Sequence, residues 1–235
     1  MNINDKLKQL YESHWDGFIE QGKKLTTCIP TNPMLLKLNE DYFSTETKRI
    51  IICGQETWGW ENFGTSIDHC MLVYWKFFVE KEFYEGYGKS AFWKAFRFFE
   101  EKFKLSLGEK NCTFIYQNLS KVGLNNGETG ITDEIRQLER KFFPVLRDEF
   151  KIINPDIVLF LTGPNRDSDI KFHFPDAEFI PTDDETNLRQ KAKIRSKDLP
   201  LNSFRLYHPS YYRAFTNNYK SSVINNIIKD MNQNM

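Results

Sequence analysis

The sequence contains no run of apolar residues that approaches the roughly 20 needed for an α-helix to cross a bilayer. Its start, MNINDKLKQLYESHW, lacks both the basic first segment and the apolar core of a secretory signal peptide. These two absences argue against a membrane protein and predict a soluble, cytoplasmic one.

Cysteine is scarce, and its spacing excludes the common metal frameworks. Four cysteines are present, and no two of them form a C-x-x-C pair: Cys28, Cys53, Cys70 and Cys112. A disulfide scaffold or a zinc ribbon needs closer and more regular spacing. The sequence therefore predicts buried thiols, no structural metal, no iron-sulfur cluster and no cofactor.

Charge of either sign is not in excess, because 32 basic residues balance 32 acidic ones. A broad cationic surface for non-specific nucleic-acid binding is therefore not expected, although a narrow basic groove remains compatible with this balance. Aromatic residues, in contrast, are abundant: the chain has 21 Phe, 10 Tyr and 5 Trp. Many of these rings belong in a core, but some could stack on nucleic-acid bases.

Short apolar runs alternate with helical patterns along the chain. The run Ile50 to Cys53 is β-branched and too short for a helix, which is typical of a buried parallel strand. Alternating strands and helices predict an α/β fold: a three-layer α/β/α arrangement around a mainly parallel, four-stranded central sheet. We expect one domain over residues 1–235, with an N-terminal helical part at about 1–47. The strands are expected at 50–53, 112–116, 157–162 and 204–207, with a short edge strand at 177–180 and a solvated loop or lid at 183–197.

Polar residues that suit chemistry follow three of these strands. Gln55, Glu56 and Trp58 come directly after the first strand, where open α/β sheets hold their ligands. Asn118 follows the second strand, and His208 follows the fourth. The topology predicts that the loops after these strands share one rim of the sheet.

The residues at these positions resemble the motifs of the uracil-DNA glycosylase superfamily. In its best-known branch the first motif is Gly-Gln-Asp-Pro-Tyr-His, an Asn ends the second strand, and His-Pro-Ser follows the last. This chain has GQETWG at 54–59, QNLSK at 117–121 and HPSYYRAF at 208–215. Three short motifs in this order are moderately specific, and the similarity spans about residues 48–215.

The resemblance implies a fold, a partner and a set of roles. Glu56 stands where the family has its water-activating Asp, and His208 stands where the family has the histidine that stabilises the departing uracil. The chemistry fits, because breaking an N-glycosidic bond through an oxocarbenium-like sugar requires a carboxylate and a donor to the leaving base. The implied partner is DNA that carries uracil or another damaged base, bound by a monomer.

Further roles follow from the same resemblance. Gln55 would contact the base, Trp58 would block bulk at uracil C5, and Asn118 would read the polar edge of the flipped base. Ser210 would hold a phosphate. The remaining candidates for DNA contact are Lys121, Tyr211, Tyr212 and Arg213.

The chain also departs from the family pattern. Glu56 is one methylene longer than Asp, Thr57 replaces a proline, and Gly59 replaces a histidine. A change in reach of about 1 Å can lower a rate by roughly a hundredfold. Simpler interpretations stay open: Glu56 as a salt-bridged carboxylate, Asn118 as a turn residue and Trp58 as ordinary packing.

The leading hypothesis is a DNA glycosylase that hydrolyses the N-glycosidic bond of uracil or another deaminated base in base excision repair. The alternative is a non-catalytic nucleic-acid or nucleotide-binding module that retains the fold. A third hypothesis is a hydrolase or transferase that acts on a free nucleoside or nucleotide.

Overall fold

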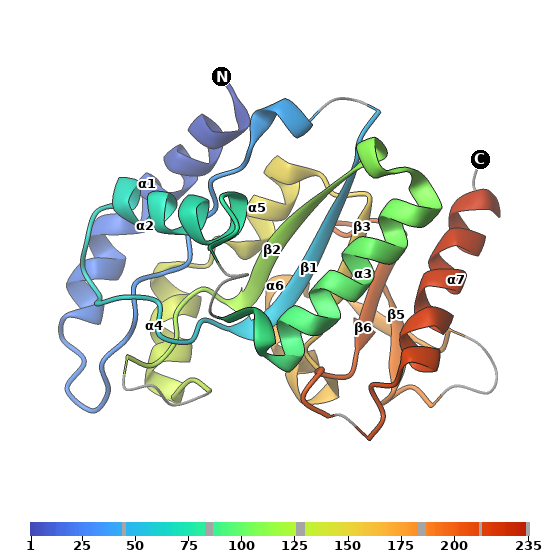
Figure 1. The fold of residues 1–235 in the computed structure, drawn as a ribbon. Helices are drawn as coiled ribbons and strands as arrows, with labels where there is room; N and C mark the ends of the chain where they lie inside the picture. The colour runs from blue at the N-terminus through green and yellow to red at the C-terminus, as the bar shows by residue number, and fades with distance from the viewer. Residues whose placement is uncertain (44–45, 83–86, 126–129, 183–186, 212, 234–235) are drawn as a thin grey trace. The chain divides into compact units, whose positions relative to one another are not determined.

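The computed structural model describes residues 1–43, 46–82, 87–125, 130–182, 187–211 and 213–233 (Figure 1). In this part of the chain the fold is α/β, as predicted, with seven α-helices and six strands. No helix among these residues is long and apolar enough to span a membrane. The helices are α1 Ile3–Gly22, α2 Ile67–Tyr74, α3 Ala91–Leu107, α4 Asp133–Phe142, α5 Leu146–Ile153, α6 Asp167–His173 and α7 Asn217–Gln233. The strands are β1 Lys48–Glu56, β2 Cys112–Ser120, β3 Ile157–Phe160, β4 Glu178–Ile180, β5 Lys191–Arg195 and β6 Asn202–Leu206.

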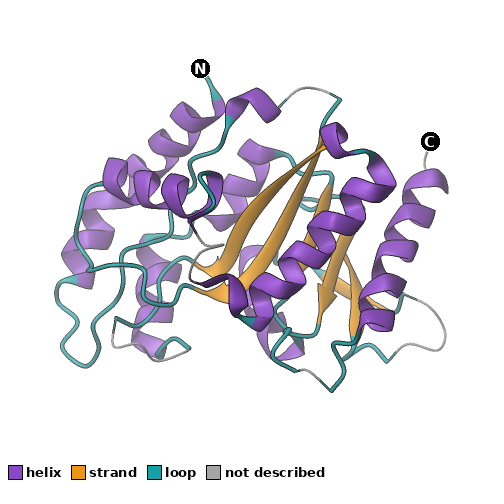
Figure 2. Ribbon diagram, in the orientation of Figure 1, coloured by secondary structure: helices purple, strands orange, loops and turns teal. Residues whose placement is uncertain are grey.

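The strands form one mixed sheet in the order β2-β1-β3-β6-β5-β4 (Figure 2). Strand β3 pairs in parallel with both β1 and β6, so that Ile157 lies beside Ile50 on one side and Asn202 on the other. Strand β5 is antiparallel to β6, and β4 is antiparallel to β5. The prediction of a four-stranded sheet was therefore wrong, because two antiparallel strands extend it to six.

The additional strand β5 lies in the mixed-charge run that was expected to be a solvated loop. Its alternate residues Ala192 and Ile194 are wholly buried, and Lys191 is almost so. Pairing with β6 and β4 buries this segment despite its charged composition. The short edge strand expected at 177–180 is confirmed as β4.

By its internal contacts the chain divides into two compact units, each built from separate stretches of sequence. Unit 1 consists of Met1–Glu40, Gln55–Phe83 and Asn118–Ile153. Unit 2 consists of Asp41–Gly54, Tyr84–Gln117 and Asn154–Met235, and it contains most of the sheet. Whether the two units form a single domain stays a prediction.

Unit 1 is organised around α1, which contacts α2, α4 and α5. The apolar face of α1 includes Leu7, Tyr11 and Phe18, all wholly buried. The Phe18 ring lies 4.6 Å from the ring of Phe143, measured between centroids. The helix is capped by Asn2, whose side chain accepts a hydrogen bond from the backbone N–H of Asp5.

The apolar periodicity between residues 132 and 150 predicts one long helix, but the structure has two. Helix α4 ends at Phe142 and α5 begins at Leu146, with Pro144 in the connection. Proline lacks a backbone N–H and its ring clashes with the preceding turn, so a continuous helix is disfavoured here. The two shorter helices both pack on α1.

Unit 2 places helices on both faces of the sheet. Helices α3 and α7 lie side by side on one face, and α6 lies behind the strands (Figure 1). The aromatic residues of α3 explain its burial: Trp93 packs 4.7 Å from Tyr116 of β2, between ring centroids. Burial of such rings contributes about 25 cal/mol per Å² of apolar surface.

Candidate functional site

The predicted first motif lies at the end of β1, with its side chains in unit 1. Gln55 and Glu56 are the last two residues of the strand, and both are half-buried. The Glu56 Oε1 atom accepts a hydrogen bond of 2.9 Å from the backbone N–H of Gly130. This bond orients the carboxylate.

The turn after Glu56 is fixed by contacts with two other segments of unit 1. Thr57 is buried, and its hydroxyl lies 3.2 Å from the hydroxyl of Thr31. Gly123 approaches the same turn so closely that a Cβ there would lie 1.9 Å from the Thr57 carbonyl oxygen. Thr31 also accepts from and donates to the Gly123 backbone, with both bonds at 2.9 Å. Tertiary contacts therefore hold this turn, at the position where the uracil-DNA glycosylase motif has a proline.

Two predicted base contacts of unit 1 differ sharply in exposure. Trp58 is 53% exposed, so its ring is accessible from solvent. Asn118 is 1% exposed and belongs to strand β2, although the sequence placed it in a polar loop. Its Nδ2 atom lies 3.9 Å from the Met34 sulfur. The amide nitrogen of Asn118 therefore contacts a buried residue, Met34.

Lys121 was predicted to contact DNA phosphate, and its position in the structure does not suit that role. Its side chain is 0% exposed, and its ammonium pairs at 2.8 Å with Glu149, which is equally buried. The Tyr11 hydroxyl donates a 2.6 Å hydrogen bond to the same carboxylate. Burying an ion pair is tolerated only when both partners are well coordinated, so Lys121 is a core residue of unit 1.

A second carboxylate lies beside this buried pair. Glu139 is buried, and its Oε1 atom accepts a 2.7 Å hydrogen bond from the backbone N–H of Lys121. Burial raises the pKa of Glu139 from 4.5 to about 8, more than the Lys121 contacts lower it. Glu139 therefore fastens the segment that includes Gly123, which in turn contacts the first motif.

The third motif lies in unit 2, directly after β6. The His208 ring is half-buried, and its Nδ1 atom accepts a 3.3 Å hydrogen bond from the backbone N–H of Ser210. Burial first, and the positive charge of Arg166 second, lower the pKa of His208 from 6.5. The imidazole is therefore neutral at pH 7, with its proton on Nε2, because Nδ1 is used as an acceptor.

Three of the residues that follow His208 are exposed, as a contact with DNA requires. Ser210, Tyr211 and Arg213 all lie on the surface of unit 2. The Tyr211 ring lies 5.0 Å from the Tyr207 ring, between centroids, in an edge-on arrangement. Tyr212 lies outside the described residues.

Sequence reasoning missed two guanidinium groups near the His208 segment, one of them buried and the other half-buried. Arg205 of β6 is 1% exposed and binds Asp167 at 2.9 and 3.2 Å through Nε and Nη2. Arg166 donates a 3.0 Å hydrogen bond to Asp169 of α6. The signal in the sequence was the polar stretch NRDSD after the third strand and glycine.

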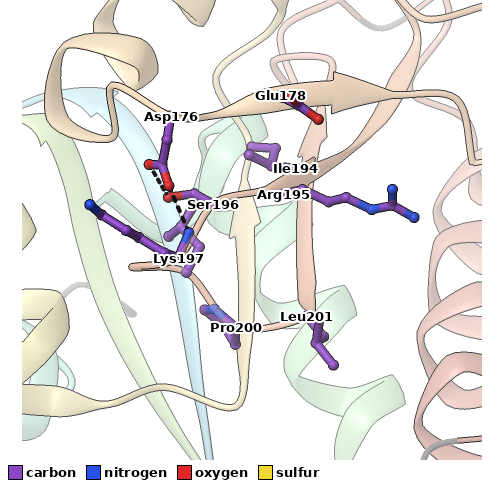
Figure 3. Close-up of a pocket in the computed structure, with 9 residues that line it drawn as sticks. Asp176, Glu178, Ile194, Arg195, Ser196, Lys197, Pro200 and Leu201 are labelled. Carbon is purple, nitrogen blue, oxygen red and sulfur yellow. Dashed lines mark hydrogen bonds between the residues drawn. The ribbon is translucent and has the colours of Figure 1, made fainter.

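In unit 2 the structure also contains a cavity of about 440 Å³, near the end of β5 and the start of β6 (Figure 3). Its polar wall is internally bonded: Asp176 accepts hydrogen bonds from the Ser196 hydroxyl at 2.7 Å and the Lys197 backbone N–H at 3.0 Å. No predicted site residue lines it. The lining residues are Asp176, Glu178, Ile194, Arg195, Ser196, Lys197, Leu199, Pro200 and Leu201.

No protein-family model matches the chain, and no curated protein matches it significantly. Membership of the uracil-DNA glycosylase superfamily therefore stays a prediction from three motifs. Among the described residues, no group of three or more His, Cys, Asp or Glu side chains is arranged to hold a metal ion.

Proposed function

We propose that this protein hydrolyses the N-glycosidic bond of uracil, or of another deaminated base, in DNA. In this reaction the bond between the sugar C1′ and the base nitrogen breaks, and the electron pair leaves with the base. A water oxygen bonds to C1′, and its proton passes to a carboxylate. The reaction needs a base for the water and a donor for the anionic leaving group.

The observation that carries this proposal is the state of His208. A neutral imidazole with its proton on Nε2 can donate a hydrogen bond to the anionic exocyclic oxygen of the departing base. The Ser210 N–H selects this tautomer by bonding to Nδ1 at 3.3 Å.

Glu56 is assigned the role of the general base. Its carboxylate follows a buried strand and accepts the Gly130 N–H at 2.9 Å, which orients it. The finer description of the fold belongs to the same proposal. Helices on both faces of the sheet in unit 2 support a three-layer α/β/α arrangement of the uracil-DNA glycosylase type, with two antiparallel strands added at one edge.

The test is base release from defined oligonucleotides. Single- and double-stranded DNA with one uracil, hypoxanthine or xanthine is incubated with the full chain, and alkali-labile sites are quantified on a gel. We expect release by the wild type. Loss of one transition-state partner in Glu56→Gln or His208→Ala should slow release by about 10²–10³-fold.

Two matched variants control for general damage to the fold. Glu12→Gln removes an exposed carboxylate of α1, and His14→Ala removes another imidazole of the same helix. Both should release base at the wild-type rate. No alkali-labile site with any of the three bases would reject the activity. Faster turnover of a free nucleoside than of any oligonucleotide would show that the substrate is a free nucleoside and not DNA.

A second candidate function is a non-catalytic module that binds nucleic acid or nucleotides. The burial of Asn118 favours it, because an amide with 1% exposure is not available to read a base without a rearrangement. This function predicts binding of uracil-containing DNA, measured by fluorescence anisotropy, that is unchanged in Glu56→Gln and His208→Ala. It also predicts no base release by the wild type.

A further inference from the structure

In unit 2, His208 comes two residues after the end of β6, so the direction in which the chain leaves this strand places the imidazole. The register of the antiparallel pair of β5 and β6 brings Tyr207 opposite Gln190, at the next position beyond Leu206. The Leu206 carbonyl accepts a 2.8 Å hydrogen bond from the N–H of Gly163, on the β3 side of the strand. Because successive residues of a strand direct their backbone polar groups to opposite sides, the Tyr207 N–H points toward β5.

A side-chain hydroxyl stands between Tyr207 and Gln190, where a continued ladder would have a direct backbone bond. The hydroxyl of Tyr219, in α7, accepts a 3.1 Å hydrogen bond from the Tyr207 N–H. The same hydroxyl donates a 2.6 Å hydrogen bond to the carbonyl of Gln190. A hydroxyl can donate one proton and also accept, so it satisfies both backbone groups at the point where the two strands separate.

Tyr219 is itself held in place at the start of α7. Its backbone N–H bonds the Thr216 hydroxyl at 3.2 Å, which closes the first turn of the helix. Its ring centroid lies 5.5 Å from that of Phe215 and 6.3 Å from that of Tyr207. Burial raises the pKa of the Tyr219 hydroxyl, so this group keeps its proton and remains a donor at neutral pH.

The segment that receives the Tyr219 hydroxyl is also fixed. Arg205 of β6 donates 2.8 Å hydrogen bonds to the carbonyls of the two preceding residues, Leu188 and Arg189. The Arg205 side chain is almost wholly buried. Side chains of β6 and α7 therefore bond three successive carbonyls, the last of which is that of Gln190. The hydroxyl bridge thus joins Tyr207 to a well-anchored part of the sheet.

The bridge acts on the residue directly before His208. After His208, the Tyr211 N–H bonds the His208 carbonyl at 2.9 Å and closes a turn. The histidine therefore lies between two fixed backbone points, the hydroxyl bridge at Tyr207 and this turn. Neither contact uses the imidazole ring, so both set its position through the backbone.

We propose that Tyr219 is a positioning residue for the proposed reaction. Its hydroxyl fixes the Tyr207 backbone where the chain leaves β6, and thereby the place from which the His208 imidazole reaches the departing base. A displacement of about 1 Å in such a donor can lower a rate by roughly a hundredfold. This inference rests on the proposed function for the identity of the reaction. The hydroxyl bridge itself does not depend on it.

The first test is amide hydrogen exchange, followed by nuclear magnetic resonance in the full chain. Tyr219→Phe keeps the ring and removes only the hydroxyl, which leaves the Tyr207 N–H without its acceptor. Relative to the amides of β3, we expect the Tyr207 amide to exchange roughly three- to tenfold faster than in the wild type, as the loss of one hydrogen bond implies. The ring shifts of His208, assigned by their disappearance in His208→Gln, should move as well.

Tyr207→Phe is the matched control, since it removes a hydroxyl from the residue next to His208 and from the same group of rings. That hydroxyl takes no part in the bridge, so the amide at position 207 should keep its protection. Tyr219→Met is a second variant without the hydroxyl, used if circular dichroism shows that Tyr219→Phe fails to fold. If the amide at position 207 and the His208 ring respond no more in the folded Tyr219 variant than in Tyr207→Phe, the inference is overturned.

The same proteins are assayed for base release, which separates this inference from the proposed function. Loss of a positioning contact should lower kcat by roughly ten- to a hundredfold and leave KM near the wild-type value. Tyr207→Phe should retain both constants. Faster exchange and a shifted His208 ring without base release by any protein would support the bridge and reject the reaction. Base release by Tyr219→Phe at the wild-type kcat would preserve the reaction and reject the positioning role.

Discussion

The two units bury their charges in different ways. In unit 1, Lys121 and Glu149 form an ion pair that is closed off in the core, with the Tyr11 hydroxyl on the same carboxylate. In unit 2, the Arg166 side chain is 12% exposed and pairs with Asp169, and its charge, after burial, is the second cause that lowers the pKa of His208. The first arrangement specifies the position of a chain segment. The second contributes, after burial, to keeping a half-buried imidazole neutral.

This comparison shows that proximity to a motif in sequence does not assign a role. Lys121 lies in a segment that resembles a glycosylase motif, yet it is a core residue. Arg166 belongs to none of the motifs, yet it influences the histidine that carries the proposed reaction. Four experiments test this distinction.

The largest expected effect comes from opening the ion pair of unit 1. Lys121→Met leaves the Glu149 carboxylate buried without its cation, and removal of one partner of such a pair destabilises a protein by about 3–5 kcal/mol. We expect that loss in the free energy of unfolding, measured by urea denaturation with circular dichroism.

The control is Lys151→Met, which removes a lysine from an exposed pair with Asp148 on α5. Pairs of that kind contribute about 0–1 kcal/mol. Equal effects of the two substitutions would show that Lys121 is solvated, and would return it to the candidates for DNA contact.

The next effect tests the contact that holds the first motif. Gly123→Ala forces a methyl group against the Thr57 carbonyl, and overpacking of this kind costs about 1–3 kcal/mol. Gly17→Ala is the matched control, because its Cβ would meet only the Phe142 ring at 3.9 Å within a helix. There alanine should stabilise by roughly 0.5–1 kcal/mol. A neutral Gly123→Ala would mean that the turn at Thr57 is free to move.

Glu139 in unit 1 and His208 in unit 2 should make the free energy of unfolding depend on pH with opposite sign. The pKa of Glu139 is raised to about 8 in the folded state, so its contribution to stability is lost as pH rises from about 4.5 to 8. The pKa of His208 is lowered, so its contribution is present above pH 6.5 and is lost as pH falls.

Urea midpoints measured across pH 5 to 9 would show this difference. Glu139→Gln should remove the decline of stability toward alkaline pH, while the amide oxygen still accepts the Lys121 N–H. His208→Gln should remove a decline toward acidic pH. Identical pH profiles for the two variants would contradict the assignment.

The smallest expected effect concerns the tautomer of His208. Ser210→Pro removes the N–H that bonds Nδ1, a hydrogen bond worth about 0.5–1.5 kcal/mol, so the Nε2–H form should lose its excess. Ser210→Ala keeps that N–H and should change nothing. Ring ¹⁵N shifts report the tautomer directly. An unaltered tautomer in folded Ser210→Pro would show that another contact selects it.

Much of the fold was predictable from local pattern. The β-branched run 50–53 forms a strand as expected, and the strand expected at 157–162 is present but ends at Phe160. Such apolar segments are stable only when buried on both faces. The weak apolar signal at 177–180 also indicated a strand correctly. Pro144 indicated a break between two helices, but the apolar periodicity on both sides of it favoured the prediction of one continuous helix.

Parts of the candidate site were not predictable in this way. Lys121 and Lys191 read as solvated cations, yet both are buried, because their burial depends on partners or strands far away in the sequence. The apolar periodicity that starts at Leu7 predicts Asn4 as the cap of the first helix, but the Asn4 side chain bonds Leu38 and Glu40, and Asn2 caps α1. A polar side chain takes the partner that tertiary structure supplies.

Hydrophobic periodicity and strand breakers act locally, so the amino-acid pattern alone locates the buried strands and the polar residues that follow them. Which charges are enclosed, and which lie near a titratable group, depends on contacts that form only in the folded chain. The free energy of a charge depends on what surrounds it in space, and residues such as Glu149 and Arg166 come to Lys121 and His208 only through folding.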